Sequence, residues 1–151
     1  MARRTTTNIG NRQLDISFID YDSQDGNSIG FNNAKMITGV YKLAQKFAHI
    51  LLTPIGSDLT DPTYGTNLVS LTSYNIIKNM DALVMIYVSE ASEQLVRYQD
   101  EVGAEVENLD ERLLRAKLED FTSTLDTINL SVRITSESGD DLLIIIPYSR
   151  S

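Results

Sequence analysis

Residues 51–68, which read LLTPIGSDLTDPTYGTNL, constrain the fold more than any other segment of the chain. They join an apolar helical pattern to a loop that is dense in glycine and proline. Because a residue that precedes proline avoids the helical conformation, Pro54 predicts that the preceding helix stops at Thr53. Gly56 and Gly65 permit a positive φ on either side of the central Asp-Pro pair. The sequence therefore specifies the backbone path of this loop more strongly than its side-chain chemistry.

The composition limits the classes of function that the chain can have. Its 151 residues are the size of one domain, so we expect a flexible tail at residues 1–12 and a single domain at residues 13–151. The formal net charge of −8 repels phosphate backbones and anionic lipids, which argues against nucleic-acid and membrane partners. The basic pair Arg3-Arg4 is then best interpreted as part of the solvated tail. The longest apolar runs fall far short of the roughly 20 residues that a membrane helix needs.

The sequence contains few residues that could form a catalytic or metal-binding site. The chain has no cysteine and a single histidine, His49, so cysteine ligands, thiolate nucleophiles and two-histidine metal sites are excluded. His49 falls in the last turn of a predicted helix, where its protonated form would interact with the helix dipole. The carboxylates of residues 90–107 fall between apolar helical positions, as on a solvated face, and no nucleotide-binding glycine motif is present. We therefore expect no enzymatic activity, catalytic residue, cofactor, metal or small-molecule substrate.

The hydrophobic pattern changes its period along the chain. Alternation over residues 14–18 predicts a short N-terminal strand, and the polar residues 20–33 predict a surface loop. Apolar residues at helical spacing predict a helix over residues 36–51. The same spacing over residues 76–102 predicts one extended helix or two joined end to end. A capping box then predicts a third, shorter helix over residues 108–121. Its buried side would consist of Leu109, Leu113, Leu114, Ala116, Leu118 and Phe121.

The C-terminal segment has the character of paired strands. Residues 128–134 alternate with a period of two and residues 142–146 are uniformly apolar, which predicts a β-hairpin across residues 136–141. Because Pro147 cannot donate a hydrogen bond, we expect the last strand to fray or to lie at an edge there. The order of elements favours an α+β fold. We predict a helical core of two long helices plus a short one, packed on a small antiparallel sheet formed by the N-terminal strand and the C-terminal β-hairpin.

The predicted hairpin is a candidate for protein binding. Its last strand, residues 142–146, either buries both faces or offers an edge to a strand of a neighbouring molecule. Pairing with the N-terminal strand of the same chain is an equally good interpretation, since strand order cannot be read from sequence. The candidate residues on the two strands are Ile128, Leu130, Val132, Ile134, Leu142, Ile144 and Ile146.

The loop and its neighbours resemble a known family. A helix ending in Leu-Leu-Thr-Pro, a Gly-Ser turn, the motif Pro-x-Tyr-Gly-Thr-x-Leu, a long helix and a closing β-hairpin follow one another over residues 34–148. This order is similar to that of the phage baseplate wedge family related to W proteins, whose members also occur at the base of type VI secretion machines. The resemblance marks a protein-binding loop that consists of Thr53, Pro54, Gly56, Asp61, Pro62, Tyr64, Gly65 and Thr66.

The resemblance implies a structural subunit of the tail baseplate in the virion, assembled in the host cytoplasm. Such a subunit would contact other baseplate wedge proteins and the tail sheath protein, in multiple copies of a six-fold assembly around the tube. The hairpin would template the first sheath ring by inter-subunit strand pairing. Family members carry Glu-Pro-Arg before the penultimate strand, where this chain has Leu125-Asp126-Thr127, and Glu111-Arg112 is a candidate substitute. The acidic helix at residues 90–107 is long for the family and would add a contact surface.

Two alternatives stay open. A small regulatory adaptor of the same fold would bind a cytosolic protein and block it. A cell-wall-degrading, lysozyme-like hydrolase would need two carboxylates in opposed environments, one kept protonated and one ionised, for which Asp58 and Asp61 are the loop candidates.

Overall fold

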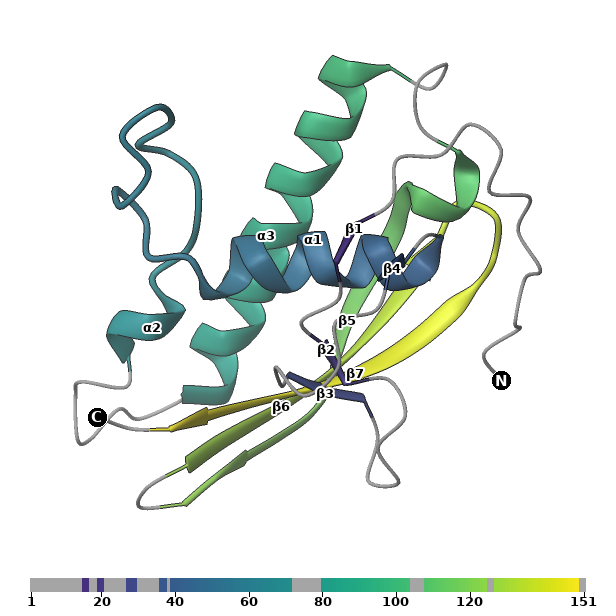
Figure 1. Ribbon diagram of the computed structural model, residues 1–151. Helices are drawn as coiled ribbons and strands as arrows, with labels where there is room; N and C mark the ends of the chain where they lie inside the picture. Colours follow the sequence, from purple (N-terminus) through teal and green to yellow (C-terminus); the bar gives the residue numbers. More distant parts are fainter. Residues whose placement is uncertain are drawn as a thin grey trace.

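The computed structural model describes residues 15–16, 19–20, 27–29, 36–37, 39–71, 80–103, 108–124 and 127–149. The predicted tail at residues 1–12 lies outside them. Figure 1 shows helices gathered on one side of a twisted sheet. The elements, in chain order, are β1 (Asp15–Ile16), β2 (Ile19–Asp20), β3 (Asn27–Ile29), β4 (Met36–Ile37), α1 (Val40–Leu52), α2 (Leu68–Leu71), α3 (Met80–Val102), the 3-10 helix η1 (Leu109–Glu111), β5 (Leu113–Ser123), β6 (Thr127–Ser136) and β7 (Asp141–Ser149).

The C-terminal third of the chain forms three antiparallel strands, β5, β6 and β7. The predicted hairpin is confirmed: β6 pairs with β7, and Val132 lies opposite Ile144. The strand β7 does not fray at Pro147, which lies opposite Asn129, because the ladder continues to Ser149. Alternation of side chains across the pleat turns one apolar row of each strand toward the helices.

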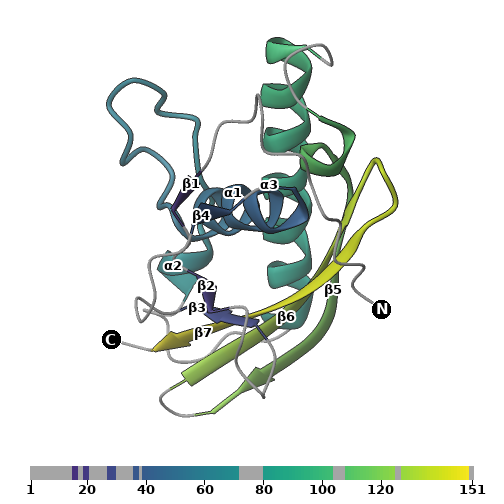
Figure 2. The same cartoon turned by 45° about the vertical axis from the view of Figure 1, so that its right-hand side comes forward.

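The helices α1 and α3 cover this sheet on one face (Figures 1 and 2). The core lies between the two layers, where each buried leucine, isoleucine or phenylalanine contributes about 1.5–3 kcal/mol of transfer free energy. Its largest fully buried apolar side chains are Leu43, Phe47, Leu51, Val84, Leu130, Val132, Ile134, Ile144 and Ile146. The fold is therefore α+β, with two helices packed on three antiparallel strands, β5, β6 and β7, which are part of a five-stranded sheet in the order β2-β3-β7-β6-β5.

The third predicted helix, over residues 108–121, is wrong: apart from the short η1, this segment is the strand β5. Register shifts in its pairing with β6 lie between Leu113 and Arg115 and between Leu118 and Asp120. Each shift adds a residue to β5, as a β-bulge does. The core-facing residues of β5 are Leu113, Ala116, Leu118 and Phe121. They are three, two and three positions apart, a spacing that resembles that of a helix.

The N-terminal part of the prediction is confirmed only in its coarse features. The strand β1 pairs with β4, a segment predicted as helical, and α1 begins only at Val40 after Gly39 with a φ of 66°. The direct neighbour of β7 is β3, which pairs with it in parallel at Ile144 and Ile145 and comes from the predicted loop. The strand β2 pairs with β3 and not with the hairpin. The strand predicted at residues 14–18 is therefore not paired with the hairpin: its described part, β1, pairs with β4.

Both long helices are confirmed, although the first begins at Val40 and not at residue 36. The helix α1 ends at Leu52 and is capped by Thr53, whose ψ of 123° is extended, as the following proline predicts. The helix α3 begins, within the described residues, at Met80 and ends at Val102. Within the described residues, the short helices are α2, at the end of the glycine- and proline-rich loop, and the 3-10 helix η1.

Candidate functional site

The loop between α1 and α2, residues 53–66, is closed at its base by its own backbone. The carbonyl of Thr53 accepts the Thr66 N–H at 2.9 Å, and the Ile55 N–H donates to the Thr66 carbonyl at 3.1 Å. The buried Thr66 hydroxyl donates to the carbonyl of Leu51 at 2.7 Å. Figures 1 and 2 show the loop projecting beside the helices, on the side away from the sheet. The segment is thus a compact loop whose two ends touch.

Gly65 carries the closest backbone approach in this loop. Its φ is 103°, and a Cβ atom at this position would lie 2.2 Å from the Thr53 carbonyl oxygen. The Gln94 side chain of α3 holds the same glycine from the other side: Oε1 accepts its N–H at 3.0 Å, and Nε2 donates to its carbonyl at 2.7 Å. The expected positive φ is confirmed at Gly65, and also at Gly56, where φ is 83°. Only at Gly65 does the space also require a glycine.

The two loop aspartates order the backbone. Asp58 accepts hydrogen bonds from the N–H and the hydroxyl of Thr60 at 2.8 and 2.7 Å. Asp61 accepts the corresponding bonds from Thr63 at 3.1 and 2.6 Å, and the Tyr98 hydroxyl of α3 donates to its other oxygen. These bonds, led by those from the threonine hydroxyls, lower the pKa of both aspartates. Both carboxylates are therefore ionised at neutral pH, whereas a general acid needs a raised pKa.

An aromatic cluster joins the loop to the two helices. The Tyr64 hydroxyl lies 2.5 Å from Nδ1 of His49, and the rings of Tyr64 and Tyr98 are 5.9 Å apart between centroids. Burial, followed by the neighbouring Tyr98 and Asp58, raises the pKa of Tyr64 to about 12. The predicted position of His49 in the last turn of α1 is confirmed. The loop is thus fixed to both helices.

The eight predicted loop residues divide into three groups by their burial. Gly65 and Thr66 are buried within the chain and hold the loop closed. The half-buried residues are Thr53, Asp61 and Tyr64, and the exposed ones are Pro54, Gly56 and Pro62. The sequence prediction omitted Gln94 and Tyr98, which lie one turn apart on α3 and hold the loop from outside it. It also omitted Leu59, which is 94% exposed on the loop. The spacing of Gln94 and Tyr98 on one helix face was the available signal, but it does not name the segment that they contact.

The predicted hairpin residues lie together on the inner face of β6 and β7. All seven are buried beneath the helices. The strand β6 has a neighbour on each side, and β7 has β3 beside it at Ile144 and Ile145. These side chains therefore build the core, and their role in protein binding stays a prediction.

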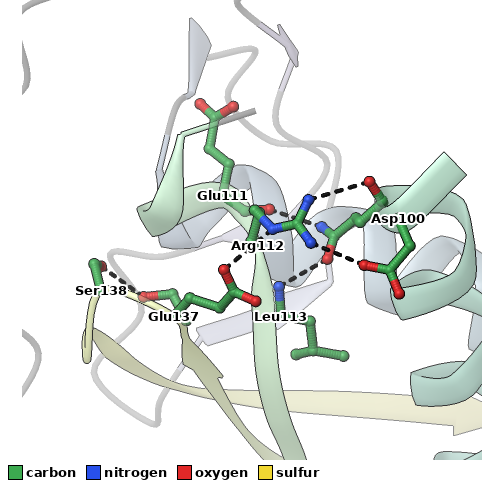
Figure 3. Close-up of polar contacts among 8 residues, drawn as sticks. Asp100, Glu111, Arg112, Leu113, Glu137 and Ser138 are labelled. Atoms are coloured by element: carbon green, nitrogen blue, oxygen red, sulfur yellow. Dashed lines mark hydrogen bonds and ion pairs between the residues drawn. The ribbon is translucent and has the colours of Figure 1, made fainter. Parts of the chain in front are cut away.

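A second polar site, the Arg112 junction, lies where α3 meets β5 (Figure 3). The Arg112 guanidinium donates to the Gln99 carbonyl at 3.1 Å, to Asp100 at 2.9 Å and to Glu137 at 3.1 Å, and the residue is only 7% exposed. The Gln99 side chain in turn accepts the Leu113 N–H at 2.8 Å. Burial alone would lower the pKa of Arg112, but the Asp100 hydrogen bond and the charge of Glu137 outweigh it, and the pKa is raised.

The preceding residue extends the junction to α1. Glu111 accepts the Gly39 N–H at 3.2 Å, and its other carboxylate oxygen lies 3.6 Å from Nζ of Lys42. Glu111 and Arg112 thus connect the start of α1, the end of α3 and the hairpin turn. Of the segment Leu125-Asp126-Thr127, the first two residues lie outside the described part of the chain.

The remaining acidic residues of α3 show no convergent site. Within the described residues, no group of three or more His, Cys, Asp or Glu side chains is placed to hold a metal ion. Glu90, Glu93 and Glu101 are exposed, while Glu105 and Glu107 lie outside the described ranges. In the part of the chain that the structure describes, no helix has the length and apolar character needed to cross a membrane.

Comparison with known proteins shows a similarity of fold to a solved structure. No protein-family model matches the chain, and no curated protein sequence matches it. The crystal structure of a candidate tail lysozyme from Geobacter sulfurreducens is similar, with a TM-score of 0.51 and 15% sequence identity. The similarity covers 78% of this chain and 97% of that chain. At this identity it shows that this chain shares the fold of that protein.

Proposed function

We propose that this chain is a structural, non-enzymatic subunit of a contractile phage tail or of a related injection machine. The observation that carries the proposal is the fold shared with a protein that is named for a tail, over 97% of that protein's length. The rigid loop over residues 53–66 adds support, because it is the segment on which the resemblance to baseplate wedge proteins rests. In this role the chain would join wedge proteins around the tail tube, in several copies of a six-fold baseplate.

The exposed part of the loop suits a contact with another wedge protein. Leu59 and Ile55 are exposed apolar side chains on a segment whose backbone is already fixed by hydrogen bonds. A fixed loop loses little conformational entropy on binding, so an apolar anchor on it contributes more of its burial energy to affinity. The flanking carboxylates of Asp58 and Asp61 favour a partner pocket with a basic rim.

The sheet would serve as the template for the first sheath ring. The strand β3 pairs with Ile144 and Ile145 of β7, while β7 itself runs on to Ser149. We propose that a strand of the sheath protein adds beside β7, either past β3 or in its place. A pairing of two residues is a weak competitor for a longer partner strand.

Site-specific crosslinking tests this arrangement, because the chain has no cysteine of its own. Pro147 is exposed on β7 and Lys117 is exposed on β5. In assembled tails, a photoreactive group on Pro147→Cys should crosslink to the sheath protein, and the same group on Lys117→Cys should not. Absence of the chain from purified tails, with the protein free in host cytosol, would replace the proposal by the adaptor function.

Hydrolysis of peptidoglycan is the second candidate, because the similar structure is named as a candidate tail lysozyme. The loop aspartates would be its carboxylates, although both have lowered pKa values. The test is release of soluble fragments from purified cell walls. We expect none from the folded protein. Release that is lost in Asp61→Asn, with unchanged circular dichroism, would establish the hydrolase instead.

A further inference from the structure

The strand β5 borders the sheet and has a single neighbour, β6, among the described strands (Figure 2). An edge strand presents a row of N–H and C=O groups that can pair with another chain. The two register shifts lie just before Arg115 and just after Leu118. A ladder over residues 116–121 therefore runs across the bulge at Glu119.

The outward face of β5 changes the sign of its charge halfway along. Lys117 is basic and the next outward residues, Glu119 and Asp120, are acidic, and all three are exposed. Within the chain, Glu119 also pairs with Arg133 of β6 at 2.6 Å. If two copies of β5 pair antiparallel about a two-fold axis at Leu118, Lys117 of each copy lies opposite the two acidic residues of the other. Opposite charges at such positions stabilise a pair of strands, and like charges destabilise it.

The inward face of β5 is complementary to itself in the same register. The bulge at Glu119 places Leu118 opposite the partner's Leu118 and Ala116 opposite the partner's Phe121, so a small residue meets a large one. Leu118, Ala116 and Phe121 are only partly buried in the single chain, although they pack against its core. A second copy would complete their burial.

An apolar groove runs beside this edge, between α3 and β5. Its lining includes Leu114 of β5 and Met85 and Val96 of α3. Leu114 is 62% exposed and Met85 is 59% exposed. Clustered exposed apolar residues of this kind mark interaction surfaces. The groove follows the edge strand, so a partner strand would cover part of it.

We propose that the β5 edge binds the β5 edge of a second copy of this chain, which joins the two sheets into one across a two-fold axis. Both the charge reversal and the match of residue sizes follow from this chain alone, as an isologous interface requires. The inference is independent of the proposed tail function, since that function uses the loop and β7.

The first test is sedimentation equilibrium of the full-length chain. The wild type should be a dimer at micromolar concentrations. Lys117→Glu should weaken dimerisation at least tenfold, because each copy would then face like charges. The control for net charge, Lys46→Glu, makes the same change of charge at a half-buried lysine of α1 and should leave the dimer unchanged. A monomeric wild type, or a dimer that Lys117→Glu does not weaken, would overturn the proposal.

A charge exchange separates pairing from simple loss of structure. The double variant Glu119→Lys/Asp120→Lys should also fail to form its own dimer. Mixed with Lys117→Glu, it should form a one-to-one heterodimer, because every cross-strand pair is again of opposite sign. In the wild type, amide hydrogen exchange over residues 115–121 should slow as the protein concentration rises. Exchange that is independent of concentration would contradict the interface without the use of any variant.

Discussion

The loop at residues 53–66 and the Arg112 junction are both polar, and both are fixed to α3, but they are built in opposite ways. The loop is largely exposed, and neutral or backbone groups supply most of its hydrogen bonds; Gln94 holds it to the helix. The junction is buried around a charged guanidinium that contacts Gln99, Asp100 and Glu137. The loop therefore fixes a backbone conformation at the surface, whereas the Arg112 junction stabilises a buried positive charge.

This difference predicts where each region is vulnerable. Water can replace the partner of an exposed hydrogen bond, so the loss of one such bond costs little stability. The loop therefore depends mainly on the close approach of the Gly65 backbone to the Thr53 carbonyl. A buried charge has no such replacement, so the junction depends on each partner of Arg112. Loss of the loop fit should alter a binding surface, whereas loss of the junction should separate α3 from the sheet.

The largest effect should come from Gly65→Val. The new Cβ atom would lie 2.2 Å from the Thr53 carbonyl oxygen, at a φ of 103° that a β-branched residue does not tolerate. Strain and displacement together should lower the free energy of unfolding by about 3–5 kcal/mol. Urea unfolding measures it. The control is Gly56→Val, which has the backbone strain, at a φ of 83°, but no atom within 4 Å of the new Cβ. Equal losses in the two variants would show that the contact with Thr53 is unimportant.

Replacement of Arg112 by methionine should have the next largest effect. It removes the partner of a buried carbonyl and of two carboxylates, and we expect a loss of about 2–4 kcal/mol in the free energy of unfolding. The value stays below the largest known cases because the Asp100 side chain is 64% exposed and water can solvate it. The matched control is Arg133→Met, which breaks the Arg133–Glu119 pair on the outer face of the sheet. Since surface pairs contribute little, the control should change stability far less, and equal losses would contradict the contrast.

The same contrast explains how much the sequence could predict. The end of α1 at Thr53 and the positive φ at Gly65 were predictable, because proline and glycine restrict the backbone within one or two residues of themselves. The hairpin was predictable from its alternating pattern. The loop's attachment to Gln94 and Tyr98 was not, because it joins segments about thirty residues apart that no local pattern relates.

At the strand β5 the prediction failed for the opposite reason, because a local pattern was present but misleading. Its apolar residues had a real periodicity, but the two bulges lengthened the spacing until it matched a helix. Asn108 and Glu111 imitated a capping box, while Glu111 in the fold accepts a hydrogen bond from Gly39 of a distant segment. Tertiary contacts therefore decided the conformation of this segment, and the sequence pattern alone could not.

A smaller loss should follow from Gln94→Ala. It removes both hydrogen bonds to Gly65 from outside the loop but leaves the loop's own backbone bonds in place. We expect about 1–2 kcal/mol of lost stability, measured by urea unfolding. The loop should also loosen from α3, which faster amide exchange of Gly65 would report. If the amide of Gly65 stays equally protected in this variant, Gln94 does not fasten the loop.

The smallest effect should be a dependence of stability on pH that arises in the loop. The pKa of Asp61 is lowered in the fold, chiefly by the hydroxyl of Thr63 and then by Tyr98. A carboxylate with a lowered pKa stabilises the fold above its unfolded pKa of about 4, and this stabilisation is lost as the pH falls through the folded value. The difference in unfolding free energy between the wild type and Asp61→Asn should therefore shrink from pH 5 toward pH 2. Thr63→Val removes the leading donor and should reduce this pH dependence while the carboxylate remains. A difference that stays constant over this range would show that Asp61 does not gain from its threonine, and that the loop keeps its shape by backbone contacts alone.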